Sequence, residues 1–220
     1  MPNYCNNDIR ITADKETVAK IAQSLKSNSD DGFLNLIHPM PQELKDTVAG
    51  SDNAKPEFQK KQSEQLIEKY GADNWYDWRI ENWGTKWEVN ECYGDPFISN
   101  DGETIEFGFD TAWSPAIGAY QNFLSTHPEA SLFATYYEPG CDFMGVWDSG
   151  DDRCYKPGDY KSDDDFWTTD DDGILLDDNY GIVESKQEWE EEEEEEDVTE
   201  YVKGNARNLD KLRILIGEDA

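Results

Sequence analysis

The first forty residues show two changes in hydrophobic period. Residues 8–12 alternate between polar and apolar side chains, which predicts a strand with one buried face. Asp14 follows and can cap a helix whose apolar residues recur with helical spacing, at Val18, Ile21 and Leu25. The run from Phe33 to Ile37 predicts a second strand, ended by His38-Pro39. Together these segments predict a β-α-β unit.

Two helices are predicted next, before a tryptophan-rich stretch. Residues 41–50 are typical of a short helix and a turn. A longer helix is expected from Pro56, with its apolar residues at Phe58, Leu66, Ile67 and Tyr70. Gly71 suits the left-handed position that follows a helix. Both helices are insertions between the first and second halves of the sheet.

Residues 74–91, NWYDWRIENWGTKWEVNE, hold four of the eight tryptophans. Apolar side chains fall on even numbers over 76–80 and on odd numbers over 85–89. A straight strand could not keep one buried face through that change of parity, so a turn or bulge is expected at Asn82-Trp83-Gly84. The pattern predicts two amphipathic strands joined there.

Two interpretations of these tryptophans are open. In the structural one, Trp78, Trp87 and Trp113 fill the core of a small domain. In the functional one, Trp83 is an exposed anchor at the turn, with Arg79 and Lys86 beside it, because tryptophan and arginine are common at binding hot spots.

The second half predicts another β-α-β unit. A strand is expected over 105–111, and Ser114-Pro115 can supply an N-cap and a first helical residue. The helix should end at His127-Pro128. Strands are then expected over 132–138 and 143–147, joined as a hairpin by Pro139-Gly140.

The composition changes after Trp147. The net charge is -31, and residues 148–200 hold 23 acidic and four basic residues. Such charge repels nucleic acids and anionic membranes and favours partners with a basic surface, including proteins that themselves bind nucleic acid. The candidate partner-binding acids are Asp163, Asp164, Asp165, Asp170, Asp171, Asp172, Asp177, Asp178, Glu190, Glu191, Glu192, Glu193, Glu194, Glu195, Glu196 and Asp197.

The unbroken acidic run 190–197 has two interpretations. As a helix it would place one charge per ~1.5 Å of axis, close to the one per ~1.7 Å of duplex DNA. Alternatively it is a solvated tail that serves solubility, since like charges destabilise a helix. A last amphipathic helix is expected at 209–216, and the aromatic residues between the acids predict that the segment docks on the core.

No catalytic residue, cofactor or metal is expected. Ser114, His38 and His127 lack a hydrolase motif around the serine, and an N-terminal base at Pro2 has no support beyond its position. The four cysteines are scattered and the aspartate clusters fail the spacing of a calcium-binding loop. With no apolar leader or membrane span, a cytoplasmic location is expected.

Five motifs in order resemble the Api92-like proteins of phages and plasmids: MPNYCNN, LIHPMPQELKDT, YGADNWYDWRIENWGTKW, FDTAWSPAIGAYQNFL and YYEPGCDFMGVW. The resemblance covers about residues 1–147. It implies a YubB-type ferredoxin-like domain acting in a bacterial cytoplasm, and it implies no reaction.

We therefore expect an α+β fold: a ferredoxin-like split β-α-β sheet with helices on one face and inserted helices over 1–147, and an acidic C-terminal extension with helices over 148–220. The leading hypothesis is a phage- or plasmid-encoded protein that inhibits a host defence or nucleic-acid-handling protein as a mimic of DNA charge, in the manner of anti-restriction or anti-CRISPR proteins. The alternative is a binding module that uses its tryptophan-rich face for a peptide or small ligand.

Overall fold

The computed structural model describes residues 3–26, 32–49 and 57–192. The chain divides into two compact units, Met1–Gly158 and Asp159–Ala220, which are taken separately below. The predicted helix at 209–216 lies outside the described residues. No helix among those described is long and apolar enough to cross a membrane.

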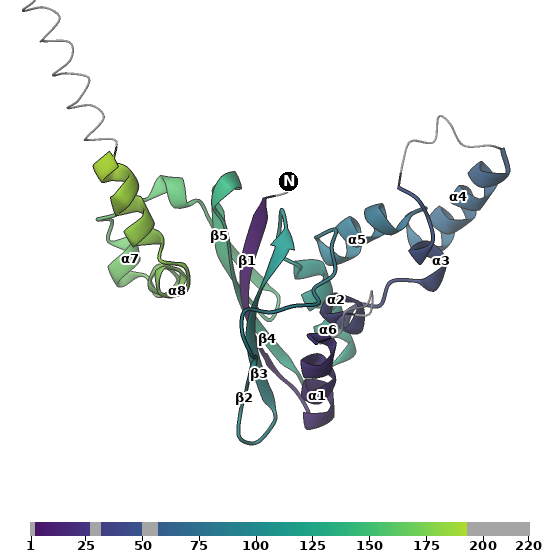
Figure 1. Ribbon diagram of the computed structural model, residues 1–220, viewed down its shortest axis with the longest axis horizontal. Helices are drawn as coiled ribbons and strands as arrows, with labels where there is room; N and C mark the ends of the chain where they lie inside the picture. The colour runs from purple at the N-terminus through teal and green to yellow at the C-terminus, as the bar shows by residue number, and fades with distance from the viewer. Residues whose placement is uncertain (1–2, 27–31, 50–56, 193–220) are drawn as a thin grey trace, which may run out of the picture. The chain divides into compact units, whose positions relative to one another are not determined.

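The first unit is built on a six-stranded antiparallel sheet (Figure 1). Its strands, in the order β2-β3-β1-β4-β5-β6, are β2 (Phe97–Ile98), β3 (Thr104–Ala112), β1 (Tyr4–Thr12), β4 (Ser131–Glu138), β5 (Phe143–Asp148) and β6 (Asp151–Tyr155). The strands predicted around residues 8–12, 105–111, 132–138 and 143–147 are confirmed. β6 was not predicted.

The central strand β1 pairs with β3 on one side and with β4 on the other, antiparallel to both. β3 and β4 therefore run parallel to each other across β1, joined by α6 (Ile117–Thr126). This is a split β-α-β unit. The mixed composition of antiparallel sheet and helices confirms the predicted α+β class.

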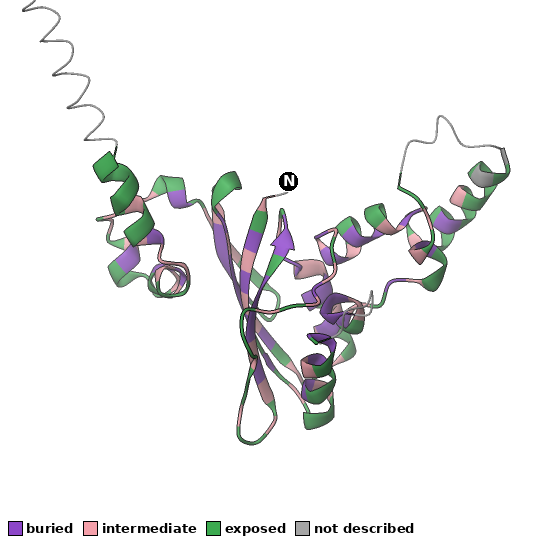
Figure 2. Ribbon diagram, in the orientation of Figure 1, coloured by how far each residue is buried: buried purple, intermediate pink, exposed green. Residues whose placement is uncertain are grey.

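The remaining helices of this unit are α1 (Lys15–Ser24), α2 (Phe33–Ile37), α3 (Gln42–Lys45), α4 (Glu57–Tyr70) and α5 (Trp75–Trp83), with 3₁₀ turns η2 (Pro139–Cys141) and η3 (Pro157–Asp159). In Figure 1, α1, α2 and α6 lie on one face of the sheet. Alternate residues of β1 are buried, including Ile9 and Ile11, and Ile105 of β3 belongs to the same buried cluster. Figure 2 shows buried residues in both the sheet and these helices. This apolar layer is the core.

The prediction of a strand over 33–37 is wrong, because these residues form α2. Its buried residues, Phe33, Leu34 and Ile37, have the spacing of one helical face as well as that of an apolar strand. Five residues, four of them apolar, are too few to separate the two, and the N-cap residue Gly32 makes no side-chain cap.

The prediction of two strands over 76–89 is also wrong, because residues 75–83 form α5. The Asn74 side chain caps the helix by accepting hydrogen bonds from the backbone N–H groups of Tyr76 and Asp77, each at 3.0 Å. Gly84 ends it with φ +88°, a left-handed conformation that glycine adopts without a steric penalty. The expected turn at Gly84 is thus the C-terminus of a helix.

Ser114 is not the N-cap of the following helix. That position belongs to Ala116, while the Ser114 hydroxyl donates to the backbone carbonyl of Gly84. Ser114 therefore ties the loop before α6 to the end of α5. The other predicted helix signals hold: Asp14 caps α1, Gly71 follows α4 with φ +81°, and His127 ends α6.

The second unit contains α7 (Phe166–Thr169), α8 (Asp171–Tyr180) and helical residues 182–192. Its aromatic residues gather locally: the rings of Tyr160 and Phe166 stack at 4.1 Å, and Trp167 lies 5.1 Å from Phe166. The Trp167 indole also donates to the backbone carbonyl of Lys161 at 2.8 Å. The aromatic residues that separate the acid clusters thus pack with one another.

Candidate functional site

A loop after α5 forms one wall of a hollow in the first unit. Its start is fixed by Thr85, whose hydroxyl donates to the backbone carbonyl of Ala112 and accepts from the N–H of Ala112, both at 3.0 Å. Its end is fixed by the backbone N–H of Tyr93, which donates to the carbonyl of Gly108 at 2.7 Å. The loop is thereby held along the C-terminal half of β3.

The hollow has a volume of about 510 Å³. We call it the aromatic hollow, and it is lined by Tyr4, Trp87, Glu88, Val89, Asn90, Glu91, Cys92, Tyr93, Asp110, Thr111 and Ala112. Its three aromatic side chains are 40–52% exposed, and the rings of Tyr4 and Trp87 lie 6.5 Å apart. Aromatic surface is therefore available to a ligand at this place.

A carboxylate, Asp110, lies on the polar face of the sheet within the hollow. Its Oδ1 accepts hydrogen bonds from the Asn6 side-chain amide at 2.8 Å and from the Tyr93 hydroxyl. Burial and the neighbouring Asp110 raise the pKa of Tyr93, so this phenol stays protonated as a donor. Two neutral donors thus orient the carboxylate without cancelling its charge.

Gly108 makes room for this arrangement. A Cβ at this position would lie 2.8 Å from the Tyr93 ring and 2.8 Å from an Asp8 carboxylate oxygen. A glycine inside a strand often marks such a close approach. Here it lets the Tyr93 ring lie against β3 and reach Asp110.

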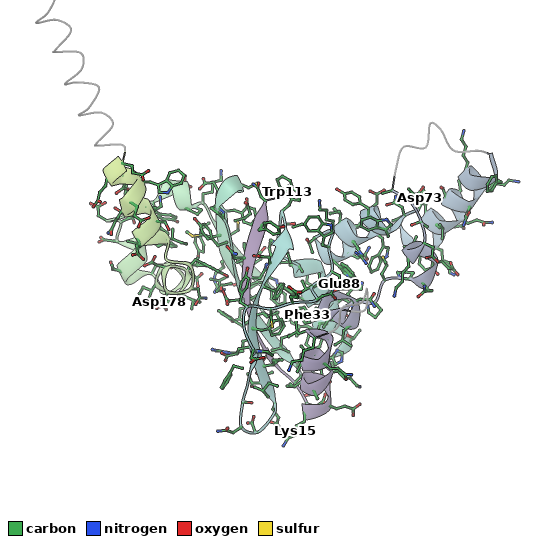
Figure 3. All side chains as sticks on the ribbon, viewed as in Figure 1. Lys15, Phe33, Asp73, Glu88, Trp113 and Asp178 are labelled. Carbon is green, nitrogen blue, oxygen red and sulfur yellow. The ribbon has the colours of Figure 1, made fainter. Side chains whose placement is uncertain are left out.

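Glu88 lies on the inner side of the same loop. Its carboxylate accepts from the backbone N–H groups of Leu34 at 2.6 Å and Asn35 at 2.9 Å, which begin α2 (Figure 3). Burial raises the pKa of Glu88 to about 7, although these donors and the charge of Arg79 act in the opposite direction. Glu88 is a structural cap supplied from another segment.

The functional interpretation of the tryptophan stretch named Trp83, Arg79 and Lys86 as a binding surface, and two of these three residues are buried. Trp83 is fully buried and its indole N–H donates to the His38 carbonyl at 2.8 Å, so the expected exposure of Trp83 is wrong. The Arg79 guanidinium is buried too, 5.3 Å from the Trp75 ring and 4.6 Å from the Trp83 ring. Trp83 and Arg79 therefore pack against each other on the buried side of α5.

Lys86 is the predicted residue that lies beside the hollow, with its ammonium group 4.2 Å from the centre of the Trp87 ring. Trp78 is buried, as the structural interpretation expected, but Trp87 and Trp113 are 40% and 45% exposed. The core assignment of Trp87 and Trp113 is therefore wrong. The exposed tryptophan of this stretch that lines the hollow is Trp87 instead of Trp83.

The second candidate surface is acidic. Residues 159–192 hold 14 acidic and two basic side chains. Four of the predicted partner-binding acids accept local hydrogen bonds: Asp164 from Phe166 N–H, Asp170 from Asp172 and Gly173 N–H, Asp177 from Val183 N–H, and Glu190 from Ser162. These four stabilise the folded unit. Glu193, Glu194, Glu195, Glu196 and Asp197 lie outside the described residues.

The other acids of this group are mostly exposed. Asp163, Asp165, Asp171, Asp178, Glu191 and Glu192 are exposed, and Asp172 is partly buried. Asp171 and Asp178 are seven residues apart on α8 and share one side of it, opposite buried Gly173 and Leu176. We call Asp163, Asp165, Asp171 and Asp178 the acidic face; Figure 3 labels Asp178.

Other candidate chemistry has local partners. Ser114 donates to the Gly84 carbonyl, while a ring nitrogen of His38 lies 3.1 Å from the Asn82 carbonyl and one of His127 lies 3.1 Å from the Phe123 carbonyl. The cysteines are all free thiols. No group of three or more His, Cys, Asp or Glu side chains in the described part of the chain could hold a metal ion.

No family model and no curated protein matches the chain. Among solved structures, the chain is similar to the crystal structure of a protein api92 from Yersinia pseudotuberculosis, described as a DUF1281 protein. The two are 12% identical, with a TM-score of 0.35, over 71% of this chain and 98% of that one.

Proposed function

We propose that this protein is a non-enzymatic accessory protein that binds a basic, nucleic-acid-binding surface of a host protein and thereby inhibits it. The observation that carries the proposal is the 14-to-two excess of acidic over basic side chains in residues 159–192, with all four residues of the acidic face exposed. A basic cleft that attracts DNA phosphates would attract this surface by the same electrostatic interaction.

The sequence motifs supply the biological context of the proposal. Their resemblance to Api92-like proteins favours a phage or plasmid origin, a YubB-type ferredoxin-like domain and action in a bacterial cytoplasm. Host defence and restriction proteins commonly have to hold DNA. An acidic decoy carried by a mobile element would compete with DNA for that surface.

The test is capture from a nuclease-treated bacterial lysate on the immobilised full-length chain, followed by salt elution and competition with duplex DNA. We expect basic nucleic-acid-binding proteins to be captured, released by added salt, and displaced by duplex DNA. Capture that ignores both salt and DNA would refute the charge-mimic mechanism.

A matched pair of variants separates a specific surface from total charge. Changing the acidic face to asparagine at Asp163, Asp165, Asp171 and Asp178 should weaken capture by roughly tenfold, chiefly through slower association. The control changes four exposed acids of the first unit, Glu64, Glu68, Glu81 and Glu129, to glutamine. Equal loss in both variants would show that only net charge matters.

The aromatic hollow favours a second candidate function, a binding module for a peptide or small ligand. Its exposed Tyr4, Trp87 and Tyr93 and its volume of about 510 Å³ are the features of a ligand site. In that case Trp87→Ala should abolish partner capture, whereas neutralising the acidic face should change little.

A further inference from the structure

We propose that the aromatic hollow binds the side chain of an arginine presented by a basic segment of a partner protein. The site joins the exposed ring faces of Tyr4 and Trp87 to the oriented carboxylate of Asp110. It belongs wholly to the first unit and is separate from the acidic face. The proposal rests on the second candidate function, a binding module that uses the hollow, and names its ligand; it does not depend on the acidic-face proposal.

One of these aromatic rings, that of Trp87, already contacts a cation. The Lys86 ammonium group lies 4.2 Å from the centre of the Trp87 ring, within the range of a cation–π interaction. Lys86 itself is only partly buried. The electron-rich indole thus attracts positive charge in this environment.

The Asp110 carboxylate is the second feature of the site that suits a cation. Asp110 accepts from the Asn6 amide and the Tyr93 hydroxyl, both of them neutral donors. Among the described residues, no lysine or arginine forms an ion pair with Asp110. An oriented carboxylate that keeps its charge is suited to a charge-assisted hydrogen bond from a guanidinium group.

The charged residues in and around the hollow also bear on the choice of ligand. Glu88 and Glu91 also line the hollow, while no lysine or arginine is among its lining residues. Lys86 contacts the lining residue Trp87, and the charges of Lys26 and Arg79 act on Cys92 and Glu88. Because the Glu88 carboxylate is bound to the backbone of α2, Asp110 and Glu91 are the lining acids that would attract a cationic ligand.

The geometry of the hollow favours arginine over lysine as the bound side chain. A guanidinium is planar, so it can stack on an aromatic ring and donate two parallel hydrogen bonds to a carboxylate at once. The hollow offers both kinds of partner on neighbouring walls, with aromatic rings at Tyr4 and Trp87 and a carboxylate at Asp110. An ammonium group would gain the charge attraction without the planar stacking.

A backbone outlier lies at the edge of the same site. Trp113, next to the lining residue Ala112, has φ +73°, which is unusual for a bulky residue. Its N–H donates to the carbonyl of Asn3, the residue before Tyr4, at 3.0 Å. Strain of this kind often accompanies functional sites, and the indole of Trp113, labelled in Figure 3, is 45% exposed.

The test uses the full-length protein and two capped hexapeptides of glycine and serine that differ at one residue, arginine or citrulline. Citrulline has nearly the shape of arginine without its charge. We measure binding by NMR titration, following the Trp87 indole and Asn6 amide signals. We expect the arginine peptide to bind roughly tenfold more tightly than the citrulline peptide.

Variants locate the binding and decide its mechanism. Asp110→Asn and Trp87→Leu should each reduce arginine binding by about tenfold, with chemical shifts elsewhere unchanged as evidence of folding. Glu129→Gln removes an exposed acid that does not line the hollow and should have no effect. Equal binding of both peptides, or full binding by Asp110→Asn, would overturn the proposal.

The acidic-face variant keeps this result separate from the proposed function. It should bind the arginine peptide as well as the unchanged protein does, even if it captures no partner. If the acidic-face variant alone loses the peptide, the arginine site is not in the hollow. The two proposals can therefore fail independently.

Discussion

The Glu88 carboxylate accepts a hydrogen bond of 2.6 Å from the backbone N–H of Leu34, across 54 residues of sequence. A second carboxylate oxygen binds the N–H of Asn35 at 2.9 Å. Helices usually take such a cap from a serine, threonine, aspartate or asparagine just before their first turn. Here the loop that lines the aromatic hollow supplies it, so the loop and α2 depend on each other.

We expect Glu88→Gln to change how stability depends on pH. Because the folded-state pKa of Glu88 is raised to about 7, above the ordinary value of 4.5, the folded protein binds its proton more tightly than the unfolded chain does. The wild type therefore loses stability from this group as pH rises from about 4.5 to 7. Glutamine carries no such charge, so the variant should gain about 2 kcal/mol relative to the wild type between pH 5 and pH 8.

Urea denaturation at several pH values measures this difference. Glu91→Gln, which changes an exposed acid of the same loop, is the control and should show no comparable trend. A constant difference between the wild type and Glu88→Gln over the whole range would mean that the three backbone donors, from Leu34, Asn35 and Val89, keep the carboxylate ionised throughout.

The strands of the sheet could be predicted because their signal is local. In β1, for example, Ile9 and Ile11 alternate with polar residues, and that alternation alone identifies the buried face. Residues 33–37 lack such a signal, and the alternation at 76–80 is misleading because these residues are helical. The first segment is short and is capped by distant Glu88, and the helix over 75–83 buries Trp78 and Trp83 while its alternating tyrosine and isoleucine positions are exposed.

The candidate site was harder to predict than the fold. Asn6, Tyr93 and Asp110 meet because β1 pairs with β3 in a register that places Asn6 opposite Asp110. The register brings together residues that are 104 positions apart in the sequence. Nothing in the sequence of β1 or of β3 alone indicates it. Gly108 is the one local signal, since a glycine inside an apolar strand suggests that another group approaches closely.

Trp83 and Trp87 should behave oppositely when changed to alanine. Trp83 is fully buried against Trp78, so Trp83→Ala should lower the free energy of unfolding by about 3–5 kcal/mol. Trp87 is 40% exposed, and its loss should cost about 1 kcal/mol while removing one wall of the hollow. Thermal unfolding compares the two, and equal costs would contradict the burial difference.

Gly84→Ala should be more destabilising than the same change at Gly71. Both glycines have a left-handed backbone, with φ +88° and φ +81°, so alanine is strained by about 1 kcal/mol at either. At Gly84 the added Cβ would also lie 2.9 Å from the Pro115 carbonyl oxygen, whereas nothing lies within 4 Å at Gly71. We expect an extra loss of at least about 1 kcal/mol at Gly84 in urea denaturation.

A buried polar pair, Asn7 and Tyr120, offers a test of the joint between the sheet and α6. The Tyr120 hydroxyl donates to the Asn7 side-chain oxygen at 3.3 Å, and the Asn7 amide donates to the Thr111 hydroxyl at 2.9 Å. Both residues are fully buried. Tyr120→Phe leaves the Asn7 oxygen without this donor and should cost about 1–2 kcal/mol.

Asn7→Leu should cost more, because it leaves the Tyr120 hydroxyl in the core without its acceptor and also removes the Asn7 amide donor to Thr111, whose hydroxyl still donates to the Ser114 carbonyl at 2.8 Å. The double variant Asn7→Leu with Tyr120→Phe removes donor and acceptor together. Its cost should therefore be less than the sum of the two single costs, by about 1 kcal/mol. Strict additivity in urea denaturation would show that the 3.3 Å contact contributes nothing, and that Thr111 and the Cys5 carbonyl, which accepts from the Asn7 amide at 2.8 Å, hold Asn7 without help from α6.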